Sequence, residues 1–95
     1  MKPEFHPAAA QELAAAVLAY EERASGLGLD LLLEARRLIA LLCDTPRIGE
    51  PLDDAYRRFP MRRFPLAIIY RMDTDVLRVI AVAHRRRRPG YWRVR

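Results

Sequence analysis

Hydrophobic residues in the first part of the chain recur at helical spacing. Residues 7–24 contain no glycine and no further proline after Pro7, which stands where the first turn of a helix tolerates the missing donor. The larger apolar residues of this run lie at i, i+4 and i+7: Leu13, Val17 and Tyr20. The pattern predicts a helix over residues 7–24, preceded by a short extended segment at residues 4–6.

A second apolar face follows the break at Ser25-Gly26. Its core positions again recur at helical spacing: Leu31, Ala35, Leu38 and Leu42. The run ends at Asp44-Thr45-Pro46, because a residue that precedes proline disfavours the helical conformation. Two helices with so short a connection are antiparallel neighbours, so the sequence predicts a helical hairpin.

Residues 47–54 are rich in turn-forming residues and predict a loop. After this loop, the spacing of apolar residues changes from helical to alternating. Residues 56–63 alternate, with Phe59 and Met61 on one side and three polar-tipped residues on the other: Tyr56, Arg58 and Arg62. Pro60 favours an edge or a bulge in this strand. Residues 64–71 and 76–83 are nearly continuous apolar runs around the turn residues 73–75 and predict the buried strands of a hairpin.

These elements predict one α+β domain over residues 1–95, in which the helical hairpin packs on one face of a small twisted antiparallel sheet in the order β-α-α-β-β-β. The 95 residues are 52% hydrophobic and 31% charged, enough to fill a single core and too apolar for disorder. No apolar run approaches the roughly 18 residues of a membrane span, and residues 1–4 do not resemble a signal peptide. The only cysteine, Cys43, excludes an internal disulfide and multi-cysteine metal sites, so we expect a cytoplasmic protein.

Charge divides the chain into two halves of opposite sign. Residues 1–55 carry five basic and ten acidic residues, a net charge of −5, whereas residues 56–95 carry twelve arginines, no lysine and two aspartates, a net charge of +10. Arginine binds phosphate and carboxylate in a planar fork and stacks on bases, so the second half indicates an anionic macromolecular partner. The alternative is an arginine-rich surface that only reflects a GC-rich genome.

The most unusual stretch is the last one, residues 81–93, where a buried strand becomes basic and aromatic. Six arginines lie in residues 85–95 beside Tyr91 and Trp92, a combination that single-stranded nucleic-acid sites use for phosphates and bases. The alternative is that the two aromatic rings fold back on the core as a C-terminal lock while the arginines are solvated, and for Trp92 we favour it. His6 and His84 have no metal ligands at suitable spacing, so no metal or other cofactor is expected.

Residues 62–71 (RRFPLAIIYR) and 81–92 (AVAHRRRRPGYW) together resemble the two closing motifs of the RelE/ParE toxin superfamily, and the helical hairpin followed by strands resembles its architecture. The resemblance implies the toxin of a type II toxin-antitoxin module, bound by a cognate antitoxin in a hetero-oligomer. ParE-like members block DNA gyrase, whereas RelE-like members cut messenger RNA on the ribosome. The PGYW ending is more similar to ParE-like members.

The resemblance also places candidate catalytic residues, for the case that the protein cleaves RNA, at Arg58, Arg62, Arg85 and Tyr91. Cleavage needs a general base as well as neutralisation of the phosphate, and arginine supplies only the second. Arg58 stands where cleaving members tend to have lysine, so Tyr91 or His84 would have to act as the base. We therefore expect gyrase inhibition, with a ribosome-dependent mRNA endonuclease that needs no metal as the alternative and a non-toxic nucleic-acid-binding module as the second.

Two binding surfaces are expected for such a toxin. The predicted target-binding residues are those of the basic half and the aromatic ending: Arg62, Arg63, Arg85, Arg86, Arg87, Tyr91 and Trp92. The first helix carries more alanine than one stripe can bury, and small residues allow a partner helix to approach closely. We expect the antitoxin to cover this helix at Ala15 and Ala19 and to approach the arginine-rich half with acidic residues.

Overall fold

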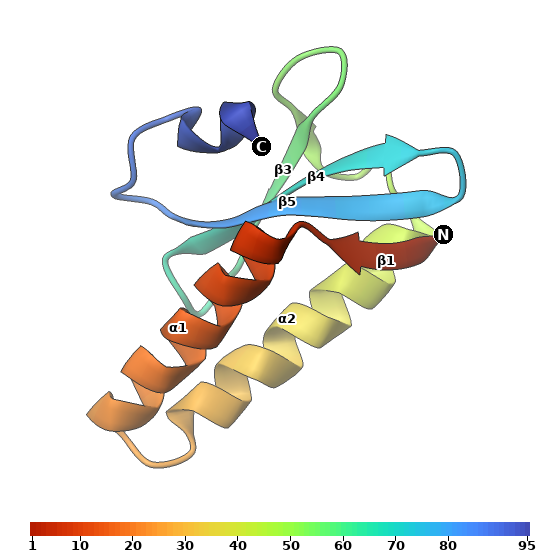
Figure 1. Cartoon of the computed structure of the whole chain (residues 1–95). Helices are drawn as coiled ribbons and strands as arrows, with labels where there is room; N and C mark the ends of the chain where they lie inside the picture. Colours follow the sequence, from red (N-terminus) through yellow and green to blue (C-terminus); the bar gives the residue numbers. More distant parts are fainter.

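A helical hairpin covers one face of a five-stranded sheet, and a short C-terminal helix lies on the other face (Figure 1). The computed structural model describes residues 1–95. The elements in chain order are β1 (Lys2–Phe5), α1 (Pro7–Arg23), α2 (Leu27–Asp44), β2 (Glu50–Pro51), β3 (Arg57–Pro60), β4 (Leu66–Asp73), β5 (Val76–His84) and the 3-10 helix η1 (Tyr91–Val94). The predicted α+β class and the hairpin on one sheet face are confirmed. None of the helices is both long enough and apolar enough to cross a bilayer.

Side chains cap the start of both helices. The His6 Nδ1 accepts a hydrogen bond of 3.1 Å from the Ala8 N–H at the start of α1, and α1 ends one residue earlier than predicted. Glu21, near the end of α1, accepts hydrogen bonds from the N–H groups of Gly26 and Gly28. This carboxylate satisfies free donors at the start of α2, which therefore begins at Leu27, before the apolar pattern does.

The sheet is larger than the sequence predicts. Its strand order is β1-β5-β4-β3-β2, with β1 parallel to β5 and every other pair antiparallel. The predicted loop at residues 47–54 contains the two-residue strand β2, and the short extended start of the chain becomes β1. The predicted strand at residues 56–63 shortens to β3, and its Pro60 lies beyond the last β2 partner, so its missing N–H costs no sheet hydrogen bond.

A β-bulge interrupts the pairing of β5 with β4. Ile69 of β4 pairs with Ala81, but the next residue, Tyr70, pairs with Val79, so Ile80 is the extra residue. Ile80 and Ala81 consequently pack together on the face away from the helices, while Val82 returns to the helix-facing core. Strict alternation would place Ile80 and Val82 on one face, and the bulge separates them.

Two hydrophobic clusters sandwich the sheet. The larger one joins the hairpin to the inner face of β4 and β5, through residues such as Leu31, Leu42 and Ile68, which are essentially fully buried. The smaller one lies on the opposite face and consists of Ile69, Ile80, Ala81 and Trp92. Burial of apolar surface on both faces explains why β4 and β5 read as continuous hydrophobic runs rather than as alternating strands.

We expect Gly49→Ala to destabilise the fold through Tyr70. Tyr70 is fully buried, its hydroxyl donates to the Pro46 carbonyl over 2.6 Å, and the hydroxyl accepts from the Gly49 N–H over 3.0 Å. A Cβ on Gly49 would collide with the hydroxyl and ring of Tyr70. Overpacking of this kind costs about 1–3 kcal/mol, measurable as a lower urea midpoint at unchanged m-value.

Tyr70→Phe provides the control for this contact. It leaves the Pro46 carbonyl and the Gly49 N–H without their partner, at a cost of about 1–3 kcal/mol, but it removes the hydroxyl, which is the atom that the new Cβ would approach most closely, while the ring carbons stay in place. The double variant should therefore lose less free energy of unfolding than the sum of the two single variants. Strict additivity would show that the two residues do not clash.

Candidate functional surfaces

The arginines of the basic half divide into paired and unpaired groups. Five form ion pairs with carboxylates: Arg63, Arg71, Arg78, Arg93 and Arg95. Arg57 donates to the carbonyls of Arg47 and Gly49 instead. The other six have no carboxylate partner within the chain: Arg58, Arg62, Arg85, Arg86, Arg87 and Arg88. We call these six the free arginines; their charge is available to an anion from outside.

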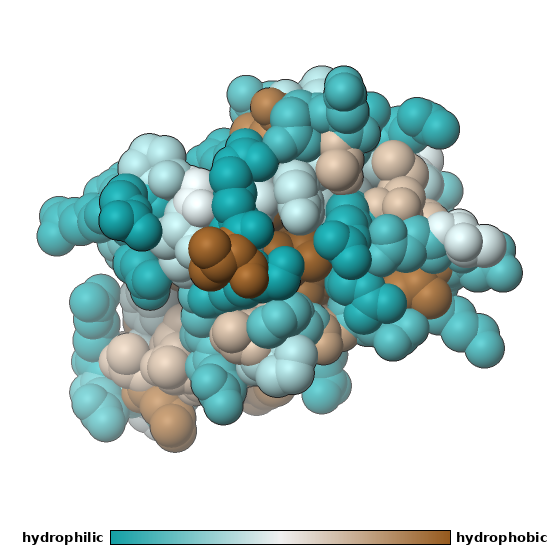
Figure 2. All heavy atoms as spheres, turned by 45° about the horizontal axis from the view of Figure 1, so that its top comes forward, coloured by the Kyte–Doolittle hydropathy of each residue, from teal (hydrophilic) through white to brown (hydrophobic).

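Five of the six free arginines, all but Arg86, line two adjacent hollows. One, of about 270 Å³, is lined by Arg58, Arg85, Arg87 and Arg88 together with the C-terminal segment. The other, of about 360 Å³, is lined by Arg58 and Arg85 again and by Arg62. The structure thus brings six of the seven predicted target residues, all but Arg86, to two hollows that share Arg58 and Arg85. Figure 2, turned so that the top of Figure 1 comes forward, shows a mostly hydrophilic face with a few hydrophobic residues exposed near its centre.

The predicted target residues are not all equally available. Arg63 points toward the hairpin, where it pairs with Asp30 of α2 at 3.3 Å. Trp92 is 4% exposed and meets the Tyr56 ring edge-on, with ring centroids 4.8 Å apart, so the C-terminal lock is confirmed for Trp92 and its ring offers no free face to a base. Arg86 is exposed, and its N–H donates to His84 Nδ1.

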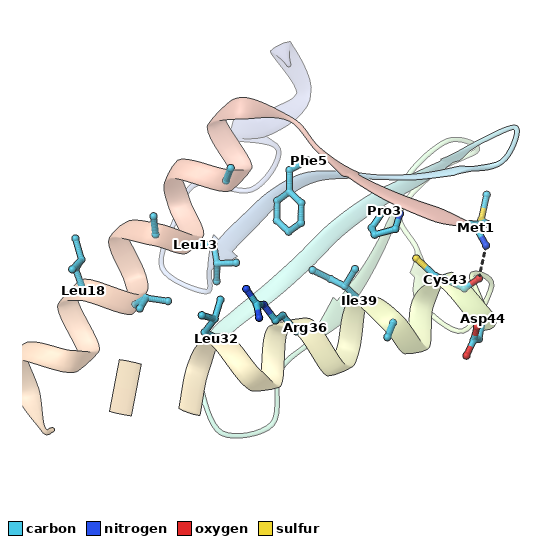
Figure 3. A pocket seen from close by; sticks show the side chains of 14 residues that line it. Met1, Pro3, Phe5, Leu13, Leu18, Leu32, Arg36, Ile39, Cys43 and Asp44 are labelled. Atoms are coloured by element: carbon cyan, nitrogen blue, oxygen red, sulfur yellow. Dashed lines mark hydrogen bonds between the residues drawn. The ribbon is translucent and has the colours of Figure 1, made fainter. Parts of the chain in front are cut away.

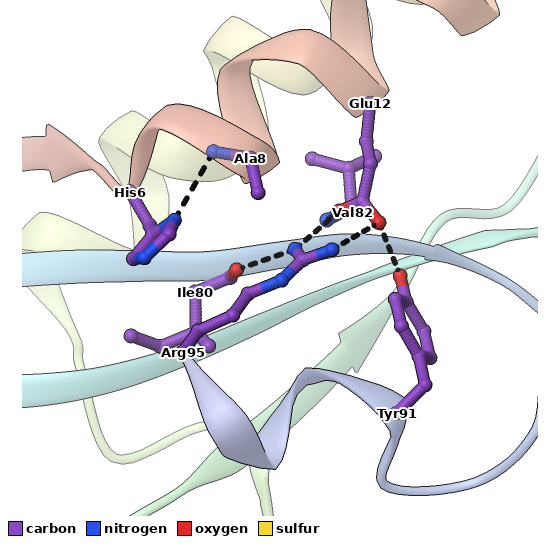
Figure 4. Close-up of polar contacts among 7 residues, drawn as sticks. All are labelled: His6, Ala8, Glu12, Ile80, Val82, Tyr91 and Arg95. Carbon is purple, nitrogen blue, oxygen red and sulfur yellow. Dashed lines mark hydrogen bonds and ion pairs between the residues drawn. The ribbon is translucent and has the colours of Figure 1, made fainter.

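Two acids that the sequence did not mark as part of the site, Glu12 and Asp53, form ion pairs with the C-terminal segment. Glu12 of α1 forms a two-point ion pair with Arg95 and accepts a hydrogen bond of 2.6 Å from the Tyr91 hydroxyl (Figure 4). Asp53 pairs with Arg93 at 2.6 Å, and this bond with those from the Ala55 and Tyr56 N–H groups lowers the pKa of Asp53 to about 2. The off-stripe position of Glu12 was visible in the sequence, but its partners lie more than 65 residues away.

The surroundings of Tyr91 disfavour proton transfer by its hydroxyl. Burial raises the pKa of Tyr91, and the hydrogen bond to the Glu12 carboxylate raises it further, to about 12. A phenol of that pKa is protonated at neutral pH, and its proton is already donated to Glu12. Its ring also carries the Arg87 guanidinium, whose central carbon lies 3.9 Å from the ring centroid.

A second surface, formed by the chain start, α1 and α2, is apolar. A groove of about 1030 Å³ runs between α1 and α2 and ends at β1 (Figure 3). Its walls are almost entirely hydrophobic, with Arg36 and Asp44 as the charged exceptions. Leu18 on the rim is 66% exposed. An apolar surface of this size at a monomer surface is typical of a protein interaction site.

The alanines of α1 divide between the groove and the solvent. Ala10 and Ala14 line the groove. Ala15 and Ala19, the predicted antitoxin contacts, are exposed but do not line it. The groove and the hollows of the free arginines share no residue, so the molecule offers two separate binding surfaces of different chemistry.

Comparisons with known proteins agree with this architecture. The family model of the ParE toxin of type II toxin-antitoxin systems, parDE, matches residues 4–89. A chain of the solved structure "Chromosomal ParDE TA system from P. aeruginosa" has 12% sequence identity and a TM-score of 0.62, over 88% of this chain and 95% of that chain, which shows a shared fold. No curated protein sequence matches. Because the family match spans nearly the whole fold, including both closing motifs up to Pro89, the chain belongs to the ParE toxin family of type II toxin-antitoxin systems.

Proposed function

We propose that this protein arrests growth by binding DNA gyrase through its free arginines and that a cognate antitoxin neutralises it. The observation that carries the proposal is the set of six arginines without internal carboxylates, five of which line two hollows that share Arg58 and Arg85. Unpaired, exposed arginine suits an anionic surface because its fork binds carboxylates and phosphates with two hydrogen bonds. The membership in the ParE family supports gyrase as the target.

The chemistry of the same surface supports binding over RNA cleavage. Arginine has donors but no acceptor for a proton, and the Tyr91 hydroxyl, with a pKa of about 12, already donates to Glu12. His84 is the one imidazole lining the hollow, and its Nδ1 already accepts from the Arg86 N–H. A surface rich in charge and poor in titratable groups is suited to recognition rather than to proton transfer.

The antitoxin is proposed to occupy the apolar groove between α1 and α2. A groove with hydrophobic walls fits the apolar face of an amphipathic helix. From the hairpin, acidic residues of the same partner can reach the net charge of +10 on residues 56–95. Both edges of the sheet contain a proline, Pro3 in β1 and Pro51 in β2, which weakens them as templates for strand addition. The helical mode therefore suits this chain better.

One experiment separates the toxin from a mere binding module. Expressed alone, the protein should stop growth, and co-expression of the protein encoded beside it should restore growth. Purified protein should inhibit supercoiling by gyrase and leave ribosome-bound messenger RNA intact. Growth without arrest would contradict the toxin proposal and favour the nucleic-acid-binding module.

The RelE-like alternative rests on one observation, the arrangement of Arg58, Arg62 and Arg85 around a hollow that could accept a phosphodiester. Tyr91→Phe discriminates between RNA cleavage and gyrase binding. A cleaving enzyme that uses the hydroxyl should lose on the order of 10² in rate, whereas a binder should lose at most a few-fold in inhibition, because the ring under Arg87 remains. Cleavage of ribosome-bound messenger RNA by the unmodified protein would replace the gyrase proposal.

A further inference from the structure

The edge of β5 lacks a strand neighbour over its last residues. β1 pairs with β5 from Val76 to Val79, and the final backbone bond of this ladder runs from the His6 N–H to the Val79 carbonyl. Beyond Val79, the backbone groups at this edge of β5 are bonded by side chains instead of by a neighbouring strand. The Ile80 carbonyl accepts from Arg95 Nη1 over 2.9 Å, and the Val82 N–H donates to Glu12 Oε1 over 3.0 Å.

The Glu12 carboxylate lies at the centre of these side-chain hydrogen bonds (Figure 4). Its carboxylate accepts from Arg95 Nη1 and Nη2, both at 2.8 Å, from the Tyr91 hydroxyl and from the Val82 N–H. The Glu12 and Arg95 side chains are only 16% and 14% exposed. Burial raises the pKa of Glu12, but the bonds from Arg95, Tyr91 and Val82 outweigh it and lower the pKa overall, which keeps the carboxylate ionised at neutral pH.

We propose that Glu12 is a positioning residue, which sets the geometry of the free arginines by clasping the C-terminal helix to the edge of β5. The inference rests on the proposed function of the arginine surface. Residues 85–90, which carry four of the free arginines, connect the end of β5 to η1. Glu12 fixes η1 at both ends, through Tyr91 and through Arg95, and Arg87 in turn packs over the Tyr91 ring.

The other contacts of η1 cannot replace this clasp. Trp92 buries apolar surface against Ile69, Ile80 and Ala81, which holds the segment to the sheet without fixing its orientation. The Arg93–Asp53 pair has side chains 47% and 39% exposed, and pairs in that setting contribute little. By contrast, the Glu12 carboxylate is part-buried and accepts from four donors, in Arg95, Tyr91 and Val82. Such buried, charge-assisted hydrogen bonds are directional and strong.

The test is Glu12→Gln, which keeps the size of the side chain and removes its charge. We expect on the order of tenfold weaker inhibition of gyrase, since the two-point pair to Arg95 is lost. The emission of Trp92, the only tryptophan, should move to the red and become more accessible to acrylamide, because η1 loosens. Binding of the antitoxin should not change. Glu22→Gln on the exposed side of the same helix, where the carboxylate makes no bond, is the matched control and should change none of these quantities.

A second variant, Arg95→Met, removes the other half of the pair at an end of the fold where unfolding is not expected. It should weaken inhibition to a similar degree, and the double variant should lose no more than either single one, because both remove the same interaction. Full inhibition by Glu12→Gln and Arg95→Met would overturn the positioning role, as would a loosened η1 with unchanged inhibition. If Arg85→Glu with Arg87→Glu also leaves inhibition intact, the proposed target surface itself fails; if that variant is inactive, the surface stands and the clasp alone is refuted.

Discussion

Replacing Arg85 and Arg87 together by glutamate is expected to abolish growth arrest and gyrase inhibition. Both side chains are exposed, neither has a carboxylate partner, and both line the hollow beside Tyr91. Reversal changes the local charge by four units, so attraction of an acidic surface becomes repulsion. Like-charge contacts cost several kcal/mol at an interface, which corresponds to a loss on the order of 10²-fold or more in inhibition.

The experiment needs a control for net charge, because a basic protein with fewer charges binds any anionic partner less well. Arg37 and Arg47 are exposed and form no ion pair, and neither lines the hollows of the free arginines. Their joint replacement by glutamate changes the net charge by the same amount and should leave growth arrest intact. Equal loss in the two double variants would show a general charge effect, and full activity of the Arg85/Arg87 variant would place the target site elsewhere.

The helices could be predicted because their signals are local. Periodic apolar residues, the break at Ser25-Gly26 and the stop before Pro46 all lie within a few residues of the structure they specify. The sheet was less predictable. β1 has four residues, one of them proline, and its parallel partner lies some 74 residues later in the chain, as in Lys2 opposite Val76. Nothing in so short a segment encodes that pairing.

The composition of the second half indicates an arginine surface, but not its support. Arg58 and Arg62 do not share a strand as the alternation predicts, because β3 ends at Pro60, but both line a hollow together with Arg85. Glu12 could be recognised as a residue outside the apolar stripe. Its hydrogen-bond partners, however, depend on the bulge at Ile80 and on how the C-terminal segment packs against β5. A clasp made by residues 12, 82, 91 and 95 emerges only when the tertiary structure brings them together.

The alanines of α1 show the same limit at the second surface. The sequence indicates surplus small apolar residues, but which of them face a partner depends on the rotation of α1 against the sheet and α2. The structure fixes that rotation: Leu13 and Val17 face both the core and the groove, and Ala10 and Ala14 continue the groove wall. Ala15, one residue along, points to solvent elsewhere.

Ala14→Glu is therefore expected to produce a toxin that its antitoxin can no longer neutralise. Ala14 is exposed, so the variant should fold and still arrest growth, but a docked apolar segment would bury the new carboxylate. Burial of a charge without full compensation costs several kcal/mol, which predicts affinity lower by about 10²-fold or more in calorimetry. Arg36 in the groove does not rescue the complex, because a carboxylate paired with it would still lose its water when the segment docks.

Ala15→Glu is the matched control for this variant, since the two alanines are adjacent, exposed and equal in size, and only Ala14 lines the groove. We expect antitoxin to restore growth in cells that express the Ala15 variant and to fail in cells that express the Ala14 variant. A stronger effect at Ala15, reproduced by Ala19→Glu, would move the antitoxin to the other side of α1, where the sequence alone first placed it. The groove would then be left without a partner, and its apolar walls would need another occupant.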